Sequence, residues 1–98
     1  MAKKENAFQA QLIKDIRERF SGCIVTKLDS SHIQGIPDLL ILYKNKWACL
    51  ECKKGKNASH RPNQDYYVSL LNHMSFSRFI FPENKEEVLN ELEQAFKS

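Results

Sequence analysis

The chain has 98 residues, a length typical of one domain that buries about 60–65% of its unfolded surface around a single core. A hydrophobic content of 42% with only three Gly and three Pro excludes disordered and collagen-like classes. The net charge of +3 is uneven, because residues 83–98 carry five acids and two bases, which leaves a net +6 in residues 1–82.

The N-terminal segment is basic and leads into an amphipathic pattern, so the sequence predicts neither a signal peptide nor a membrane span. We therefore expect a cytoplasmic protein with no membrane partner. Three cysteines are an odd number, which favours a reducing compartment. Cys49 and Cys52 lie three residues apart on a predicted strand, so they point to opposite faces and are not expected to share a metal.

The first half of the chain predicts a helix followed by three strands. The helix covers residues 5–20, stops at Ser21-Gly22 and has one apolar stripe, formed by Phe8, Leu12, Ile13, Ile16 and Phe20. Strands are expected at 23–28, 37–43 and 47–53, with a polar loop at 29–35 and a turn at 44–46. The second strand is nearly continuously apolar, which predicts helices on both faces of the sheet.

The second half predicts a helix, a strand and a last helix. Pro62 suits the first turn of a helix whose buried face carries Tyr67, Leu70, Leu71 and Met74, with Gln64 on the same face. A strand follows at 78–81. The last helix is expected to start with a capping box of Asn84 and Glu87 and to bury Val88, Leu89, Leu92, Ala95 and Phe96. Together the elements predict one α/β domain with a mixed central sheet.

The two strands on either side of the turn carry acidic groups and a lysine. Glu51 and Lys53 are two residues apart and share a strand face, and a hairpin register brings Asp38 close to them. Two adjacent carboxylates repel each other unless a cation neutralises them. Asp38, Glu51 and the backbone carbonyl of Cys52 suit Mg²⁺, and Lys53 would orient a water or stabilise developing charge. The alternative is that Asp38 merely begins a strand and that Glu51 and Lys53 form a surface ion pair.

Basic residues gather between positions 44 and 61, where Glu51 is the single acid. This concentration favours a polyanion such as DNA over a small neutral ligand, although each lysine is equally well explained as part of a solvated face. The expected DNA contacts are Lys44, Lys46, Lys54, Lys56, His60 and Arg61. Gly35 allows either a close backbone approach to substrate or only a turn, and His32 is either a phosphate contact or an exposed loop histidine.

The segments Gly35-Ile36-Pro37-Asp38-Leu39-Leu40 and Glu51-Cys52-Lys53-Lys54-Gly55, followed by Gln64, resemble the stand-alone VRR-NUC (virus-type replication-repair nuclease) branch of the PD-(D/E)xK superfamily. The resemblance covers nearly all of residues 1–98. It implies a single restriction-endonuclease-like domain with an α-β-β-β-α-β core and a C-terminal helix. It also implies Asp38 and Glu51 as metal ligands, Lys53 as the catalytic lysine and Gln64 beside the site, with Glu5 completing the metal site directly or through water.

The activity that this resemblance implies is a Mg²⁺- or Mn²⁺-dependent endodeoxyribonuclease that cuts branched DNA, four-way (Holliday) junctions above all. It implies a homodimer with a role in phage or bacterial replication, recombination and repair. Two alternatives stay open, namely a flap- or restriction-type nuclease and a non-catalytic nucleic-acid-binding module. The chain departs from the family pattern at one point. A Ser usually lies shortly before the Gln in the family, whereas four residues separate Ser59 from Gln64 here. The resemblance therefore does not define the start of the helix or the role of Ser59.

Overall fold

The computed structural model describes the chain from residue 3 to residue 98, with side chains from residue 6 onward. Its elements follow the predicted order: α1 (Lys3–Arg19), β1 (Ile24–Lys27), β2 (Leu39–Tyr43), β3 (Lys46–Cys52), α2 (Pro62–Met74), β4 (Ser77–Ile80) and α3 (Lys85–Lys97). None of the helices in this part of the chain has the length and apolar character that crossing a membrane requires.

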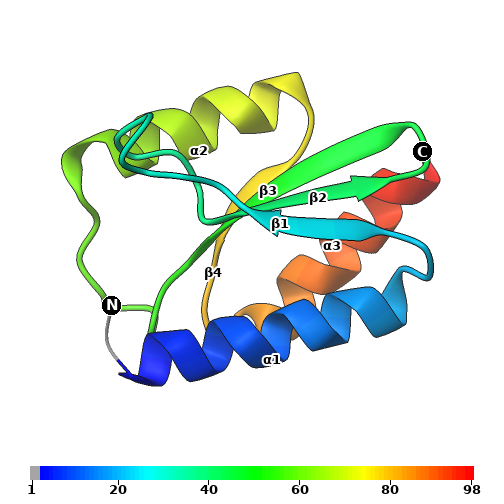
Figure 1. Cartoon of the computed structure of the whole chain (residues 1–98), viewed down its shortest axis with the longest axis horizontal. Helices are drawn as coiled ribbons and strands as arrows, with labels where there is room; N and C mark the ends of the chain where they lie inside the picture. Colours follow the sequence, from blue (N-terminus) through cyan, green and yellow to red (C-terminus); the bar gives the residue numbers. More distant parts are fainter. Residues whose placement is uncertain (1–2) are drawn as a thin grey trace.

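The four strands form one mixed sheet in the order β1-β2-β3-β4. Neighbours β1 and β2, and β2 and β3, pair antiparallel, whereas β3 and β4 pair parallel. The parallel pair is connected through α2, as parallel neighbours require a crossover. The α/β fold with a mixed sheet and a C-terminal helix is therefore confirmed (Figure 1).

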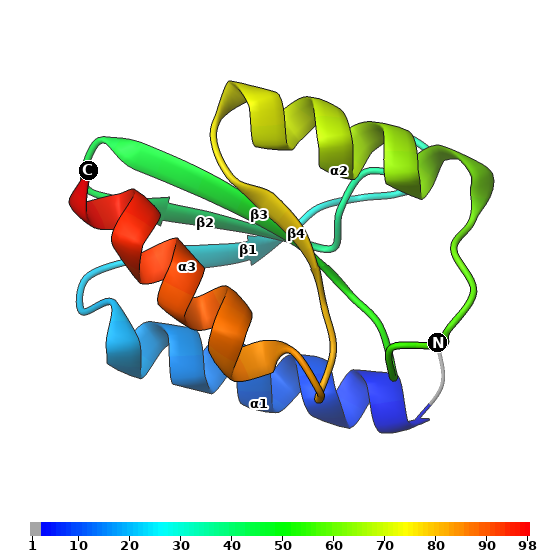
Figure 2. The ribbon, with the colours of Figure 1, turned by 180° about the vertical axis from the view of Figure 1, so that it is seen from behind.

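One face of the sheet packs on α1 and α3, which lie side by side beneath it (Figures 1 and 2). Strand alternation directs every second residue of β3 into this core, namely Ala48, Leu50 and Cys52. The helices contribute Leu12, Ile16 and Phe20 from α1 and Val88, Leu89, Leu92 and Phe96 from α3. These are the predicted stripes, and each fully buried Leu or Ile contributes about 1.5–3 kcal/mol through removal from water.

Helix α2 covers the opposite face, but only over β3 and β4. The predicted buried face of α2 is partly wrong, because Val68 is its buried residue and Met74 is 66% exposed, as is much of Leu70. A helix about 10 Å wide spans two strands spaced about 4.8 Å apart, so one helix leaves the other half of the face uncovered. Ile24 on β1 is accordingly 60% exposed, and the expectation that helices cover both faces holds only for β3 and β4.

The start of α3 also differs from the expectation. The Asn84 side chain makes no capping bond to the helix. It accepts a hydrogen bond from the Phe81 N–H at 2.8 Å and donates one to the Phe79 carbonyl at 3.1 Å. Asn84 therefore closes the turn after β4 and does not cap α3. An Asn side chain can form either hydrogen-bond pattern, and the Asn-x-x-Glu spacing does not decide between them.

The loop between β1 and β2 folds back onto the first turn of α2 (Figures 1 and 2). Gly35 makes this contact possible, because a Cβ at this position would lie 2.4 Å from the Asn63 Cβ and 2.9 Å from the Asn63 carbonyl oxygen. Its φ of +93° is also one that side-chain-bearing residues avoid. The close backbone approach at Gly35 is therefore to α2, and it fixes the distance between the 29–38 loop and the helix.

We predict that Gly35→Ala destabilises the fold more than Gly22→Ala. Gly22 has a similar φ of +88° but no atom within 4 Å of the added Cβ, so it reports backbone strain alone, about 1–2 kcal/mol. The contact with Asn63 should add about 1–3 kcal/mol of overpacking at Gly35. Urea denaturation of both variants measures the difference, and equal losses would contradict the packing role.

Candidate active site

The proposed catalytic groups lie where β2 begins and β3 ends. Asp38 immediately precedes β2, Glu51 is the second-last residue of β3, and Lys53 directly follows β3. Leu39 pairs with Leu50, and continuing that antiparallel register places Asp38 opposite Glu51. The backbone N–H of Cys52 donates to Asp38 Oδ2 at 2.9 Å, which ties the carboxylate directly to the neighbouring strand.

Lys53 is a buried lysine whose side chain is 8% exposed. A buried ammonium is costly unless its N–H groups find acceptors. Its Nζ donates to Gln64 Oε1 at 2.6 Å and to the Ser59 carbonyl at 3.1 Å, and it lies 4.0 Å from Glu51 Oε2. The predicted sharing of one strand face by Glu51 and Lys53 is therefore observed.

Gln64 joins the helix to these two charged groups. Its Oε1 accepts from Lys53 and also from the Arg61 backbone N–H at 2.9 Å, while its Nε2 donates to Glu51 Oε2 at 3.1 Å. Pro62 begins α2, and the first turn of the helix then directs Gln64 toward the sheet. An amide is suited to this position because it offers an acceptor to the lysine and a donor to the glutamate at once.

Asp38 has an electrostatic environment that opposes ionisation. Burial raises the pKa of the Asp38 carboxyl group above its ordinary value. The Cys52 N–H, the neighbouring Glu51 carboxyl group and the charges of Lys53 and Lys27 each act in the opposite direction and lower this pKa. A partly buried carboxyl beside a second carboxyl is the kind of perturbed group that clusters at functional sites.

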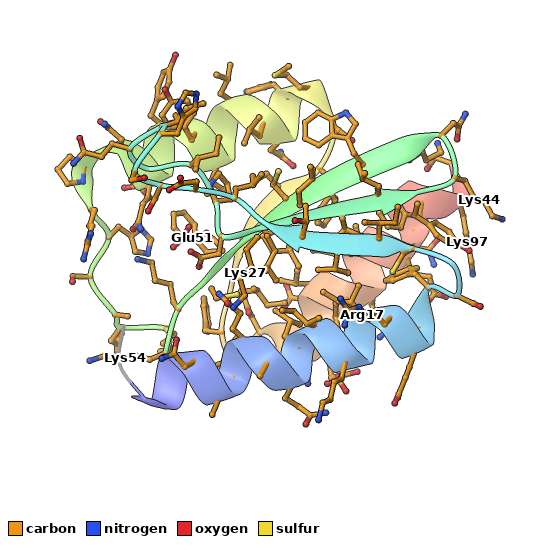
Figure 3. All side chains as sticks on the ribbon, viewed as in Figure 1. Arg17, Lys27, Lys44, Glu51, Lys54 and Lys97 are labelled. Carbon is orange, nitrogen blue, oxygen red and sulfur yellow. The ribbon has the colours of Figure 1, made fainter. Side chains whose placement is uncertain are left out.

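These groups line an open cleft of about 1170 Å³ between the sheet, the 29–38 loop and the start of α2. Asp38, Glu51, Lys53 and Gln64 are all among the residues that line it. Figure 3 shows Glu51 on the side of the sheet that faces the long loops and the start of α2. The cleft is open enough for an extended polymer, unlike an enclosed small-molecule pocket.

The donor set suits a hard cation with few protein ligands. Two neighbouring carboxylates can hold Mg²⁺ or Mn²⁺, which keep several waters. A residue's N–H and C=O point the same way in a strand, so the Cys52 carbonyl faces Asp38 as its N–H does. Among the described side chains, no three His, Cys, Asp or Glu gather as a metal site. The predicted further ligand, the Glu5 side chain, lies outside the described residues.

The thiol groups of the two β3 cysteines take no part in this site, to which Cys52 contributes only its backbone. All three cysteines are free thiols, and Cys52 faces the core while Cys49 lies on the opposite face. Burial raises the pKa of the Cys49 thiol to about 11, which keeps it protonated and unreactive. The geometry thus agrees with the expectation that the C-x-x-C spacing does not form a shared metal or redox site.

Comparison with known proteins yields a structural relative. A solved structure described as a VRR_NUC domain aligns with a TM-score of 0.58 and 29% identity, over 82% of this chain and 85% of that chain. No family model matches the sequence, and no curated protein matches it significantly. The structural match supports assignment of the chain to the VRR-NUC family.

Within this VRR-NUC fold, the predicted DNA contacts fall into two groups. Lys54, Arg61 and Gly35 line the cleft. Lys44 and Lys46 lie at the hairpin turn, at the far end of β2 and β3 from Glu51. Figure 3 shows this separation for Lys44 and Glu51. The expectation that these two lysines adjoin the carboxylates is therefore wrong. The sequence spacing is misleading because five or six extended residues separate these lysines from the carboxylates, a distance of about 17–20 Å at 3.3 Å for each residue.

The other predicted contacts lie outside the cleft lining. Lys56 and His32 are exposed. The His60 ring stacks on Phe79 with centroids 4.0 Å apart, and its Nδ1 lies 2.8 Å from Asp65 Oδ1. His60 is therefore engaged in contacts with Phe79 and Asp65, whereas the sequence predicts a phosphate contact.

Two parts of the candidate site are not predicted by the sequence patterns. Lys27 ends β1 close enough to Asp38 for its charge to lower the pKa of that carboxyl group. The antiparallel pairing of the first two predicted strands was the available signal, since it sets the end of one beside the start of the other. The Ser59 carbonyl, which holds Lys53, has no signal in the sequence because any residue can supply a backbone carbonyl.

We predict that Asp38→Asn raises the melting temperature at pH 7 in EDTA. Asparagine keeps an oxygen acceptor for the Cys52 N–H and removes the buried charge. Because the folded-state pKa of Asp38 is raised, the folded protein binds more protons than the unfolded chain between pH about 4 and that raised pKa. Stability therefore falls as pH rises through this window, and the gain from Asp38→Asn should vanish below about pH 4.

Asp29→Asn is the matched control with the opposite sign. The Ser31 hydroxyl and backbone N–H lower the pKa of Asp29, so its carboxylate stabilises the fold above the ordinary pKa. This substitution should lower the melting temperature at pH 7 or leave it unchanged. Thermal denaturation across the acid range measures both variants. A lower melting temperature for Asp38→Asn than for wild type at pH 7 would show that the ionised Asp38 carboxyl group does not destabilise the fold.

Proposed function

We propose that the chain is a Mg²⁺- or Mn²⁺-dependent endodeoxyribonuclease that hydrolyses phosphodiester bonds in branched DNA, with four-way junctions as its preferred substrate. The observation that carries this proposal is the hydrogen-bonded network of Lys53, Gln64 and Glu51 beside Asp38 in one open cleft. The VRR_NUC domain of the structural relative supports a nuclease-type activity. The whole of residues 1–98 then constitutes the nuclease domain.

In this proposal Asp38, Glu51 and the Cys52 carbonyl hold the divalent cation. When bound, the cation supplies charge neutralisation at the phosphate and acidifies a water. Lys53 places a fixed positive charge in the cleft, where it stabilises the negative charge that develops on the phosphate oxygens. Gln64 positions both Lys53 and Glu51, so neither side chain has to reorganise when the substrate arrives.

Charge and shape support DNA as the substrate. Lys54 and Arg61 stand at the cleft, and residues 1–82 carry the positive excess of the chain. Such groups bind phosphates without reading bases, which suits recognition of DNA structure rather than sequence. Cutting two strands of a four-way junction symmetrically requires two sites, so we propose a homodimer that acts in DNA recombination and repair in the cytoplasm.

The nuclease assignment is tested on labelled four-way junctions, flaps and linear duplexes with Mg²⁺, Mn²⁺ or EDTA. Wild type should cut the junction with either metal and not in EDTA. Asp38→Asn, Glu51→Gln and Lys53→Ala should each lower the single-turnover rate by at least about a hundredfold, because each removes a group that acts on the transition-state charge.

Glu18→Gln and Lys14→Ala, on the exposed side of α1, are matched controls that change the same kinds of charge and should cut as wild type does. Absence of cleavage of any substrate with either metal would refute the nuclease proposal. Preference for flaps or linear duplexes over junctions would leave the chemistry intact and refute the substrate proposal.

The position of the basic residues gives a second test. Lys54→Ala and Arg61→Ala should weaken DNA binding and each reduce the salt slope of the association constant by about 1, since each removes one phosphate contact. Lys44→Ala and Lys46→Ala, at the far end of the hairpin, should have smaller effects. Fluorescence anisotropy over a salt series in Ca²⁺ measures all four. Larger losses at the hairpin turn would place the DNA away from the cleft.

A further inference from the structure

The buried ammonium of Lys53 is held partly by a loop with no regular secondary structure. One acceptor, Gln64 Oε1, is fixed by the first turn of α2. The other is the Ser59 carbonyl at 3.1 Å, which belongs to the segment between β3 and α2. The location of this carbonyl, together with that of Gln64 Oε1, therefore sets where the lysine nitrogen lies relative to Glu51.

His60, the residue after Ser59, anchors this segment at two points. Its ring lies on the Phe79 ring with an interplanar angle of 15° and a centroid separation of 4.0 Å. Its Nδ1 lies 2.8 Å from Asp65 Oδ1. The ring face and one ring nitrogen are thus both engaged, so the orientation of the side chain is defined, and the backbone next to it follows.

Both anchors belong to parts of the site. Phe79 on β4 is the register partner of Glu51 on β3, so the two side chains leave the sheet on the same face. Asp65 directly follows Gln64 in α2. His60 consequently connects the loop that holds Lys53 to the strand next to Glu51 and to the helical turn that presents Gln64.

We propose that His60 is a positioning residue of the nuclease site, which keeps the Ser59 carbonyl against the Lys53 ammonium through its contacts with Phe79 and Asp65. The inference rests on the proposed nuclease function. It assigns His60 a role through contacts with neighbouring side chains of the chain, because His60 is not among the residues that line the cleft. A phosphate-binding histidine would instead act on the affinity for DNA.

The test separates these roles by measuring cleavage and binding independently. Single-turnover cleavage of a saturating four-way junction in Mg²⁺ gives the rate, and anisotropy in Ca²⁺ gives the dissociation constant. His60→Ala should lower the rate by about tenfold, the effect typical of supporting groups around a site, and leave the dissociation constant unchanged. His60→Phe keeps an aromatic ring on Phe79 and should be closer to wild type than His60→Ala.

An unchanged rate for His60→Ala, or a weakened affinity with an unchanged saturated rate, would overturn the positioning role. If His60→Ala fails to fold, His60→Phe gives the same comparison, because it keeps the ring packing and loses only the contact with Asp65. It should then bind DNA as wild type does and cut more slowly. A wild-type rate for His60→Phe overturns the proposal.

An NMR measurement on the DNA-free protein distinguishes failure of this inference from failure of the nuclease function. The ammonium protons of Lys53 should be protected from exchange in wild type and should lose protection in His60→Ala. Lys85, which pairs with Asp15 between α3 and α1, serves as an internal control and should not change. If wild type cuts no DNA but the Lys53 signal responds to His60→Ala, the positioning contact stands and the nuclease proposal fails. An unchanged Lys53 signal overturns the positioning contact.

Discussion

The arrangement around the cleft depends on keeping the Lys53 ammonium buried next to two carboxyl groups. A charge removed from water is stable in a protein only when hydrogen-bond partners surround it. Lys53 finds these partners in Gln64 and the Ser59 carbonyl, with Glu51 close by. The end of a strand, the first turn of a helix and an irregular loop must therefore adopt mutually consistent positions, and the network fails if one of them shifts.

Strand β3 connects this polar network to the stability of the whole domain. Its alternate residues Leu50 and Cys52 enter the core formed with α1 and α3, while Glu51 faces the cleft. The apolar core thus fixes the backbone from which the site projects, and a rigid strand defines the side-chain directions more closely than a loop does. The raised pKa of Asp38 shows that this placement destabilises its carboxylate, because burial disfavours the ionised form.

Much of the fold and the centre of the site were predictable because they follow from local periodicity. The apolar stripes of α1 and α3, the order of the elements and the proximity of Asp38 to Glu51 all follow from spacing of 3.6 or 2 residues and from a short hairpin. The α2 face was predicted less well, because Leu70 and Met74 match a helical stripe but lie beyond the two strands that α2 covers. Hairpin lysines near Glu51 in sequence are distant from it in space, since extended strands separate them.

The sequence by itself determined which groups are present and which side of each element they occupy: the two carboxylates, the lysine two residues after Glu51, and the glutamine at a helix start. These depend on residue type and on short-range backbone geometry. Only the tertiary structure decided that the Ser59 carbonyl holds Lys53, that His60 packs on Phe79, and that Gly35 contacts Asn63. Such contacts join residues far apart in the chain, or use backbone atoms common to all residues, so no local pattern specifies them.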